Sequence, residues 1–245
     1  MGSRAREIEA GMIWVTSEAI EEYSVRDSVR AAMATMPDTI ETRTICHAWL
    51  ADSLSKRFIF NKIYADLLTS DVRYSILDIG GGLTGFTRQL AQQHDYTLVD
   101  LLAHDDKSTA RAIESKVGRN FVVVEDWLKF LARTPNGRWD VVIANDLLPN
   151  VDQRLVPFIE TILPRADKIL MSLTYYNEWR WYISRRLDAD EMLTQMSWDH
   201  HILSSVLERF QDQIVEPDFS HFGKEAVSVF PNGRQVCLVN LKGMF

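Results

Sequence analysis

The sequence predicts an α/β protein built on a doubly wound, mostly parallel sheet of seven strands, preceded by a helical appendage. Three observations predict this fold. Short apolar runs alternate with helix-like segments from residue 75 to residue 174. A glycine-rich turn directly follows the first apolar run, as at the end of a buried parallel strand. Near the C-terminus, the Asn232-Gly233 step predicts a terminal antiparallel hairpin.

The N-terminal region, residues 1–70, contains almost no glycine and shows no alternating strand pattern. Apolar spacing predicts amphipathic helices over residues 17–23, 24–36 and 44–68. The last of these helices carries five polar or aromatic residues of interest: His47, Lys56, Arg57, Asn61 and Tyr64. Most of these side chains should be solvated or packed in the core. Because the helix runs directly into the first strand, one or two of them should face a bound ligand.

The second region, residues 71–245, should contain the sheet. Strands are predicted at residues 75–79, 96–100, 121–126, 139–146 and 168–174, and within the hairpin of residues 226–241. Helices are predicted between them at residues 86–93, 105–116, 127–131 and 152–163, and after them at residues 199–213. An aromatic and charged insertion, residues 175–198, breaks the alternation.

Composition excludes several classes of function. The chain has 245 residues and a net charge of −7, whereas a nucleic-acid-binding surface must neutralise phosphates. Its two cysteines, Cys46 and Cys237, lie far apart and form no metal-binding spacing, which favours a reduced, cytoplasmic chain without a metal site. No apolar run is long enough to span a bilayer, and no secretion signal is evident, so we expect no membrane partner.

The glycine turn and the strand ends predict a nucleotide-type cofactor site. Gly80, Gly81 and Gly82 follow a strand that carries Asp78, and a helix-like segment comes next. Polar residues also end the following strands: Asp100, Asp126, Asn145 and Asp146. The carboxyl ends of parallel strands meet at one edge of the sheet, which is where such folds bind ligands. Gly80-x-Gly82-x-x-Gly85, with Asp100 downstream, also matches the dinucleotide fingerprint, so an NAD(P) cofactor remains an alternative.

The acid-x-Gly-x-Gly pattern Asp78-Ile-Gly80-Gly-Gly82 resembles the first-strand motif of class I, Rossmann-like S-adenosylmethionine (SAM)-dependent methyltransferases. The helical region before the first strand and the terminal hairpin strengthen the resemblance, which covers residues 71–245. Thr84 stands in place of the third glycine of the longer family pattern, with Gly85 one position later. The resemblance implies SAM as the cofactor.

The resemblance also assigns roles to individual residues. Asp78 would organise the loop and the amino end of the methionine moiety, while Gly80, Gly81 and Gly82 would lie against the cofactor. Asp100 would accept hydrogen bonds from both ribose hydroxyls. Asp126 would accept from the adenine amine, with Trp127 supplying a neighbouring N–H or covering the ring. Asn145 and Asp146 would lie below the sulfonium and face the substrate.

The acceptor should be a small polar metabolite with an amine, guanidine or hydroxyl group. Its predicted binding residues lie in the insertion: Tyr175, Tyr176, Trp179 and Arg185. The same insertion could instead pack the appendage or form a homodimer surface. Asp146 is a candidate for orienting an amine, and His200 and His201 are the favoured candidates for a general base.

Several functions therefore remain open at this stage. The favoured one is methyl transfer to a small metabolite, and the nearest rival is an O-methyltransferase acting on a sugar or phenolic product. A reductase using NAD(P) could use the same glycine turn. A cofactor-binding partner protein without activity is the third class.

Overall fold

The computed structural model describes residues 11–186, 191–223 and 227–244, and of residues 184–186, 191 and 193 only the backbone. The strands are β1 (Ile13–Trp14), β2 (Ser75–Ile79), β3 (Asp95–Val99), β4 (Val122–Val123), β5 (Trp139–Ala144), β6 (Ala166–Tyr175), β7 (Arg180–Arg186), β8 (Glu191–Ser197) and β9 (Gln235–Lys242). The α-helices are α1 (Ser17–Ser24), α2 (Ser28–Ala34), α3 (Ile45–Asp52), α4 (Leu54–Thr69), α5 (Thr87–Gln93), α6 (Lys107–Val117), α7 (Trp127–Arg133), α8 (Leu155–Ile162) and α9 (His200–Glu208). Two 3₁₀ helices are η1 (Ile40–Arg43) and η2 (Leu163–Arg165).

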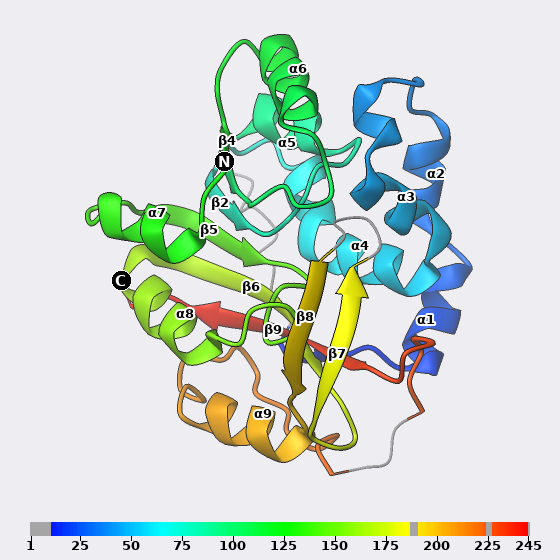
Figure 1. Cartoon of the computed structure of the whole chain (residues 1–245), viewed down its shortest axis with the longest axis vertical. Helices are drawn as coiled ribbons and strands as arrows, with labels where there is room; N and C mark the ends of the chain where they lie inside the picture. Colours follow the sequence, from blue (N-terminus) through cyan, green and yellow to red (C-terminus); the bar gives the residue numbers. More distant parts are fainter. Residues whose placement is uncertain (1–10, 187–190, 224–226, 245) are drawn as a thin grey trace, which may run out of the picture.

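Seven strands form one sheet in the order β1-β9-β6-β5-β2-β3-β4 (Figure 1). In this order, the five neighbouring strands β6, β5, β2, β3 and β4 are parallel to one another, and β9 is antiparallel to β6. The predicted doubly wound, mostly parallel seven-stranded fold is thus confirmed.

Both faces of the sheet are buried, as parallel strands require. On β2 the side chains of Leu77 and Ile79 pack with α7, α8 and α9, while Ile76 points to the other face, which α4, α5 and α6 cover. Because strand side chains alternate, Asp78 lies on the same face as Ile76. The sequence thereby places one carboxylate inside the apolar layer between β2 and α4.

The N-terminal helices differ from the prediction at two points. Residues 44–68 form two helices rather than one, because Ser53 adopts an extended conformation and its side chain caps α4 by accepting from the Lys56 N–H. The second helix begins at Ser28, since Asp27 acts as its N-cap. The region also packs directly on the sheet: Phe58 and Leu67 share one core with Ile76 and Leu98.

The predicted terminal hairpin is wrong in its pairing, although its second strand and its turn exist. The turn at Gly233 forms, with φ +79° and a 3.0 Å bond from its N–H to the Phe230 carbonyl. Residues 227–234 nevertheless form no strand, because β6 and β1 occupy the two edges of β9. The seventh strand of the sheet therefore comes from Ile13–Trp14, in a region where the sequence predicted helices alone. Residue 226, the predicted start of the hairpin, lies outside the described part.

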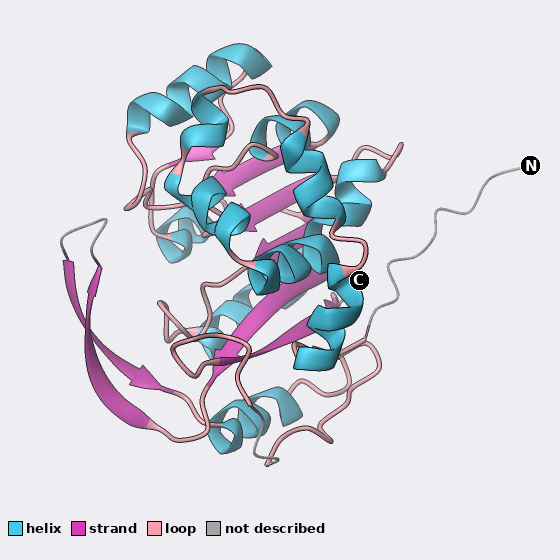
Figure 2. Cartoon of the chain, turned by 90° about the vertical axis from the view of Figure 1, so that its right-hand side faces the viewer, coloured by secondary structure: helices cyan, strands magenta, loops and turns pink. Residues whose placement is uncertain are grey.

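The insertion folds as a separate β7–β8 hairpin that projects from the body of the molecule (Figure 2). Three large apolar side chains on the hairpin are more than half exposed, Trp181, Ile183 and Met192, as is Trp179 just before β7. In the described ranges, we find no helix whose length and apolar character would let it cross a membrane.

Candidate active site

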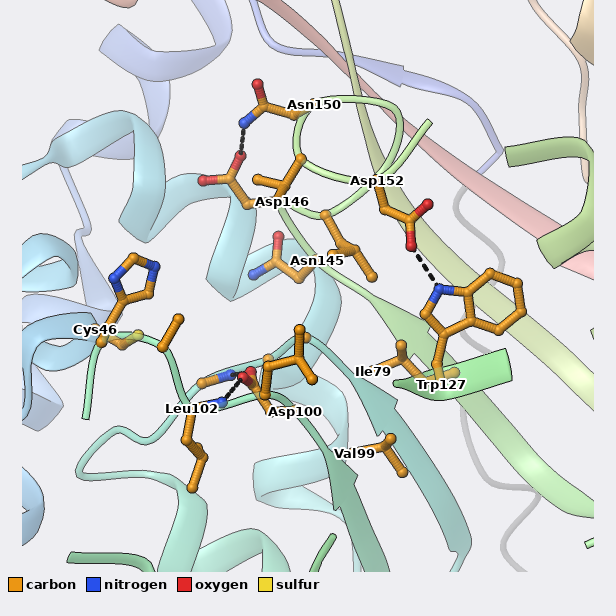
Figure 3. A pocket seen from close by; sticks show the side chains of 18 of the residues that line it. Cys46, Ile79, Val99, Asp100, Leu102, Trp127, Asn145, Asp146, Asn150 and Asp152 are labelled. Atoms are coloured by element: carbon orange, nitrogen blue, oxygen red, sulfur yellow. Dashed lines mark hydrogen bonds between the residues drawn. The ribbon is translucent and has the colours of Figure 1, made fainter. Parts of the chain in front are cut away.

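A cavity of about 890 Å³ opens at the carboxyl ends of the central strands (Figure 3). Its floor includes Gly80 from the turn after β2, Asp100 from the loop after β3 and Asn145 from the loop after β5. Helices α3 and α4 close one side with Cys46, Trp49, Lys56 and Phe60. The cavity lies where parallel strands with opposite crossovers place a ligand.

The glycine loop requires glycine at three consecutive positions. Gly80 and Gly82 adopt left-handed φ angles of +72° and +65°, which side chains rarely tolerate. A Cβ on Gly82 would also lie 2.5 Å from the Cys46 sulfur, and a Cβ on Gly81 would collide with the Asp78 carboxylate. The loop is therefore packed tightly between Asp78 beneath Gly81 and Cys46 of α3 beside Gly82, and it lines the cavity.

Asp78 lies beneath this loop rather than in the cavity lining. Its side chain is 1% exposed, and its Oδ2 accepts hydrogen bonds from the Tyr96 hydroxyl at 2.8 Å and the Tyr64 hydroxyl at 3.0 Å. Its Oδ1 is buried and has no hydrogen-bond partner within the described part of the chain. Burial raises the pKa of Asp78 to about 7, although the two tyrosine hydroxyls act in the opposite direction.

Asp100 ties the glycine loop to the loop after β3. Its Oδ2 accepts from the Gly82 N–H at 3.0 Å, and its Oδ1 accepts from the Leu102 N–H at 2.7 Å. Each carboxylate oxygen can accept about two hydrogen bonds, so one acceptor position remains on each. The side chain lines the cavity, and these two positions are what a vicinal diol requires.

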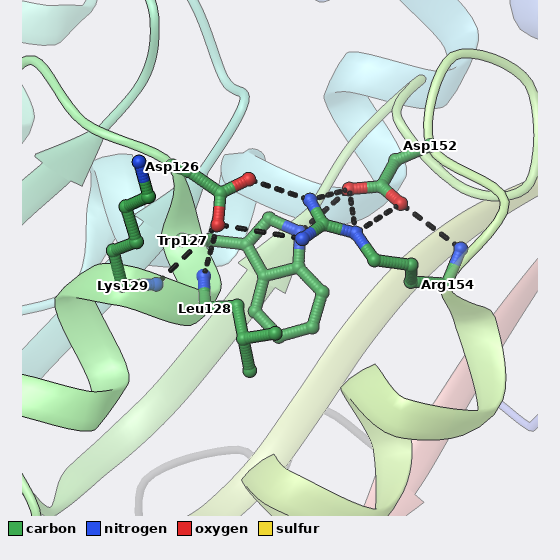
Figure 4. A network of polar contacts seen from close by, with 6 residues as sticks. All are labelled: Asp126, Trp127, Leu128, Lys129, Asp152 and Arg154. Carbon is green, nitrogen blue, oxygen red and sulfur yellow. Dashed lines mark hydrogen bonds and ion pairs between the residues drawn. The ribbon is translucent and has the colours of Figure 1, made fainter.

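Asp126 is engaged in a network at the far end of the cavity (Figure 4). It caps α7 by accepting from the Leu128 and Lys129 N–H groups, and its Oδ2 lies 2.6 Å from the Arg154 guanidinium. The hydrogen bond from Arg154 lowers the pKa of Asp126. Because Oδ1 already accepts three donors and Oδ2 accepts one, Oδ2 retains one position for a ligand.

Trp127 belongs to the same network, and its ring is largely core. The ring is buried, its Nε1 donates to Asp152 at 2.6 Å, and the Arg154 guanidinium lies 4.7 Å from the ring centre. The indole is nevertheless one of the groups that line the cavity. Its backbone N–H, at the first position of α7, has no intrahelical acceptor.

A second charged cluster surrounds Asp146 at the end of β5. Asp146 adopts a φ of +55°, held by a 2.7 Å bond from its N–H to Ser172 Oγ. Its Oδ1 pairs with Arg234 at 2.5 Å, and its Oδ2 lies 3.7 Å from the Lys56 ammonium. Burial alone would raise the pKa of Asp146, but attraction by Arg234 and Lys56 prevails and lowers it. This carboxylate stays ionised at neutral pH and is a poor general base.

Besides Asp78, five of the predicted site residues do not line the cavity: Tyr175, Tyr176, Trp179, His200 and His201. Tyr175 is buried against Trp14 and Phe222, and Tyr176 lies next to Tyr182. Trp179 is 58% exposed beside the projecting hairpin. Arg185 is in β7 with a side chain outside the described part, and His200 and His201 begin α9. Among the residues whose side chains the structure describes, the cavity lining therefore includes none of those predicted for an aromatic cage or for the favoured histidine base.

Sequence reasoning missed most of the residues that close the cavity. Arg234 and Trp49 were not singled out, and Lys56 was one of several polar residues on its helix. Cys46 lines the cavity, and burial raises its pKa to about 12, so it stays protonated and unreactive at neutral pH. His47 accepts a hydrogen bond from the Gly85 N–H at 3.1 Å and so supports the glycine loop.

Replacing Gly82 with alanine should weaken ligand binding in this cavity by at least about tenfold, because the methyl group would displace the loop that presents Asp100. Gly118→Ala is the matched control, since Gly118 also has a positive φ, +81°, but no atom of the described residues lies within 4 Å of its Cβ position. Both variants carry the same backbone strain of about 1 kcal/mol. Calorimetric titration with S-adenosylhomocysteine (SAH) measures the difference, and equal affinities for the two variants would contradict the tight packing of Gly82 against Cys46.

Comparison with known proteins gives structural similarity alone. No protein-family model matches the sequence, and no match is found among curated proteins. The N-terminal domain of EvdMO1 with SAH bound is 14% identical, over 85% of this chain and 82% of that chain, with a TM-score of 0.47. The DhpI–SAH complex is 16% identical, over 93% and 97%, with a TM-score of 0.45. Magnesium protoporphyrin IX methyltransferase (ChlM) from Synechocystis PCC 6803 with bound SAM is 12% identical, over 99% and 100%, with a TM-score of 0.44.

Proposed function

We propose that this chain is a SAM-dependent methyltransferase that acts on a small molecule. The observation that carries the proposal is the position of Asp100. Its carboxylate is fixed by the Gly82 and Leu102 N–H groups, and it keeps one acceptor position on each oxygen at the cavity floor. A ribose diol fits this arrangement, and the acid-x-Gly-x-Gly turn beside it favours SAM over a dinucleotide.

The remaining contacts follow the order of the strands. The methionine end would lie against the backbone of Gly80 and Gly82, above the buried Asp78 carboxylate. The adenine would lie toward Asp126, whose Oδ2 has one acceptor position left, beside the backbone N–H of Trp127. Asn145 would lie between these two ends, where its side chain is fixed by a 2.8 Å hydrogen bond from Ser172.

The charge of the cavity suits a cationic cofactor. Away from Asp146, five carboxylates and one arginine line it: Asp100, Asp105, Glu125, Asp126, Asp152 and Arg154. SAM carries a sulfonium and an ammonium group with only one carboxylate. An excess of acidic residues around the cavity therefore favours SAM binding, whereas a pyrophosphate would be repelled.

The chemistry would be an in-line displacement, for which SAM supplies an activated methyl group. The protein must hold the acceptor close to that methyl and exclude water, and it needs no covalent intermediate. Helices α3 and α4 line one side of the cavity with Trp49, Leu50, Ile59 and Phe60. A cavity of about 890 Å³ is of the size that small-molecule sites have, which favours a small acceptor over a nucleic acid.

Calorimetric titration with SAM, SAH and NADH tests the cofactor directly. We expect micromolar affinity for SAM and SAH and no heat with NADH. Binding of NADH alone would overturn the proposal in favour of a reductase. Binding of SAM without transfer of labelled methyl to any of a broad panel of metabolites would favour a binding protein without activity.

A further inference from the structure

We propose, on the basis of the methyltransferase function above, that the acceptor is an anionic oxygen compound with an apolar body, held by Lys56 and Arg234. A carboxylate and a phenolate share this chemistry. The proposal rests on the charged cluster at Asp146 and on the apolar wall beside it, both of which lie in the described part of the chain.

The cluster carries one more positive than negative charge. Arg234 and Lys56 both approach Asp146, at 2.5 Å and 3.7 Å, and we find no further carboxylate paired with either of these cations among the described residues. The Arg234 side chain is only 7% exposed and lies 4.2 Å from the Phe230 ring. Arg234 pairs with Asp146, so the charge in excess is that of Lys56, which is 29% exposed and therefore only partly solvated. An anionic ligand would supply a counter-charge for it.

The position of Lys56 fits a ligand-binding role. Its ammonium lies 4.5 Å from the centre of the Trp49 ring and beyond hydrogen-bonding distance of Asp146, so neither contact uses its N–H donors fully. Lys56 and Trp49 both line the cavity. A carboxylate or phenolate next to this ammonium would place its organic body against Trp49 and the nearby apolar side chains of Ile59 and Phe60.

The cluster disfavours a cationic amine, which was one of the acceptors expected from the sequence. Asp146 is the acid best placed to meet an ammonium, and two cations already neutralise it. An ammonium entering there would meet the Lys56 and Arg234 charges at close range. The aromatic residues that would have formed a cage, Tyr175 and Trp179, lie outside the cavity lining.

An anionic oxygen also needs no general base. The oxygen donates an electron pair to the methyl carbon, an O–C bond forms, and the C–S bond breaks with its electron pair remaining on sulfur. The negative oxygen and the positive sulfonium are both neutralised, and no proton moves. This balance matches a cavity in which Asp146 stays ionised and Cys46 stays protonated at neutral pH.

Binding to the SAH-loaded protein tests the proposal with three ligands of similar ring size: benzoate, p-nitrophenolate and benzylamine. We expect the two anions to bind at millimolar concentrations and benzylamine not to bind. Lys56→Met should weaken anion binding by about tenfold or more, because it removes a charge-assisted contact, while SAH affinity stays within about twofold. Lys62→Met is the matched control, since Lys62 is exposed on the same helix and also lies over an aromatic ring, that of Phe58.

The outcomes separate this proposal from the one on which it rests. Failure of SAH to bind the wild-type protein would overturn the methyltransferase function itself. If SAH binds, then preference for benzylamine, absence of anion binding, or equal anion affinity in Lys56→Met and Lys62→Met would each overturn the anionic acceptor alone. Transfer of labelled methyl to an acid or phenol, reduced in Lys56→Met and unchanged in Lys62→Met, would support it.

Discussion

Asp100→Ala is expected to lower the affinity for SAH by at least about 100-fold, the largest loss that any single polar substitution in the cavity should cause. The substitution removes two effects at once. It deletes the carboxylate proposed to accept from both ribose hydroxyls, and a hydrogen bond to a charged group is worth about 1.5–3 kcal/mol. It also leaves the Gly82 and Leu102 N–H groups without their present acceptor, so the glycine loop loses its link to the loop after β3.

Two controls distinguish lost recognition from lost folding. Asp95→Ala removes an exposed carboxylate from the other end of the same strand and should leave both SAH affinity and the melting temperature unchanged. Thermal unfolding of Asp100→Ala should remain cooperative, since Asp100 contributes no apolar packing. An SAH affinity within about threefold of wild type would show that the ribose does not bind at Asp100.

The floor of the site was predictable because it depends on local sequence. A parallel strand places whatever follows it at one edge of the sheet, so Asp100, Asp126 and Asn145 could be assigned from strand boundaries alone. The left-handed positions of the loop are likewise marked by glycine itself. These features require no knowledge of how distant segments pack.

The substrate side was not predictable, because it depends on contacts between distant segments. Arg234 meets Asp146 across 88 positions of sequence, and the Lys56 contact spans a similar distance. No local pattern distinguishes Lys56 from the other polar residues of its helix. The edge strand β1 has two residues, too few for a strand pattern, and it was missed for that reason.

The aromatic insertion misled because its composition fits a cage, a core and an exposed hairpin equally well. Its spacing held a clearer signal. Trp179, Trp181 and Ile183 alternate with polar residues, and this period of two predicts that the three side chains share one face of a strand. That face is exposed in the structure, whereas Tyr182 on the opposite face is half-buried. The spacing of the aromatic residues therefore predicted the exposure of their side chains better than their number did.

Asp78→Asn is expected to stabilise the protein at pH 8 while weakening cofactor binding. Burial raises the pKa of Asp78 from its ordinary value of 3.8 to about 7. The folded state therefore holds the proton more tightly than the unfolded state, and stability falls as the pH rises from about 4 to about 7. Above pH 7 the buried carboxylate of the wild-type protein is ionised, which lowers the free energy of unfolding by on the order of 4 kcal/mol. A neutral amide of the same size does not cause this loss of stability.

The melting temperature of Asp78→Asn should exceed that of wild type by about 8 °C at pH 8, and the difference should disappear toward pH 4. Thermal unfolding between these pH values provides the measurement. Tyr64→Phe and Tyr96→Phe serve as controls, because each removes a hydroxyl that donates to the carboxylate. Each should destabilise the wild-type background at pH 8 by about 1–3 kcal/mol and the Asp78→Asn background by less.

A carboxylate that costs stability is expected where it serves binding. Asp78 lies directly beneath Gly81, and its Oδ1 has no hydrogen-bond partner among the described residues. Only two neutral tyrosine hydroxyls stabilise its charge, below the loop that would hold a cationic methionine end. Asp78→Asn should therefore weaken SAM binding at pH 8 by about tenfold or more, even though the fold becomes more stable. A variant that is both more stable and unchanged in SAM affinity would show that the charge has no part in binding. If Asp78→Asn is less stable than wild type at pH 8, burial of the Asp78 carboxylate does not lower the free energy of unfolding.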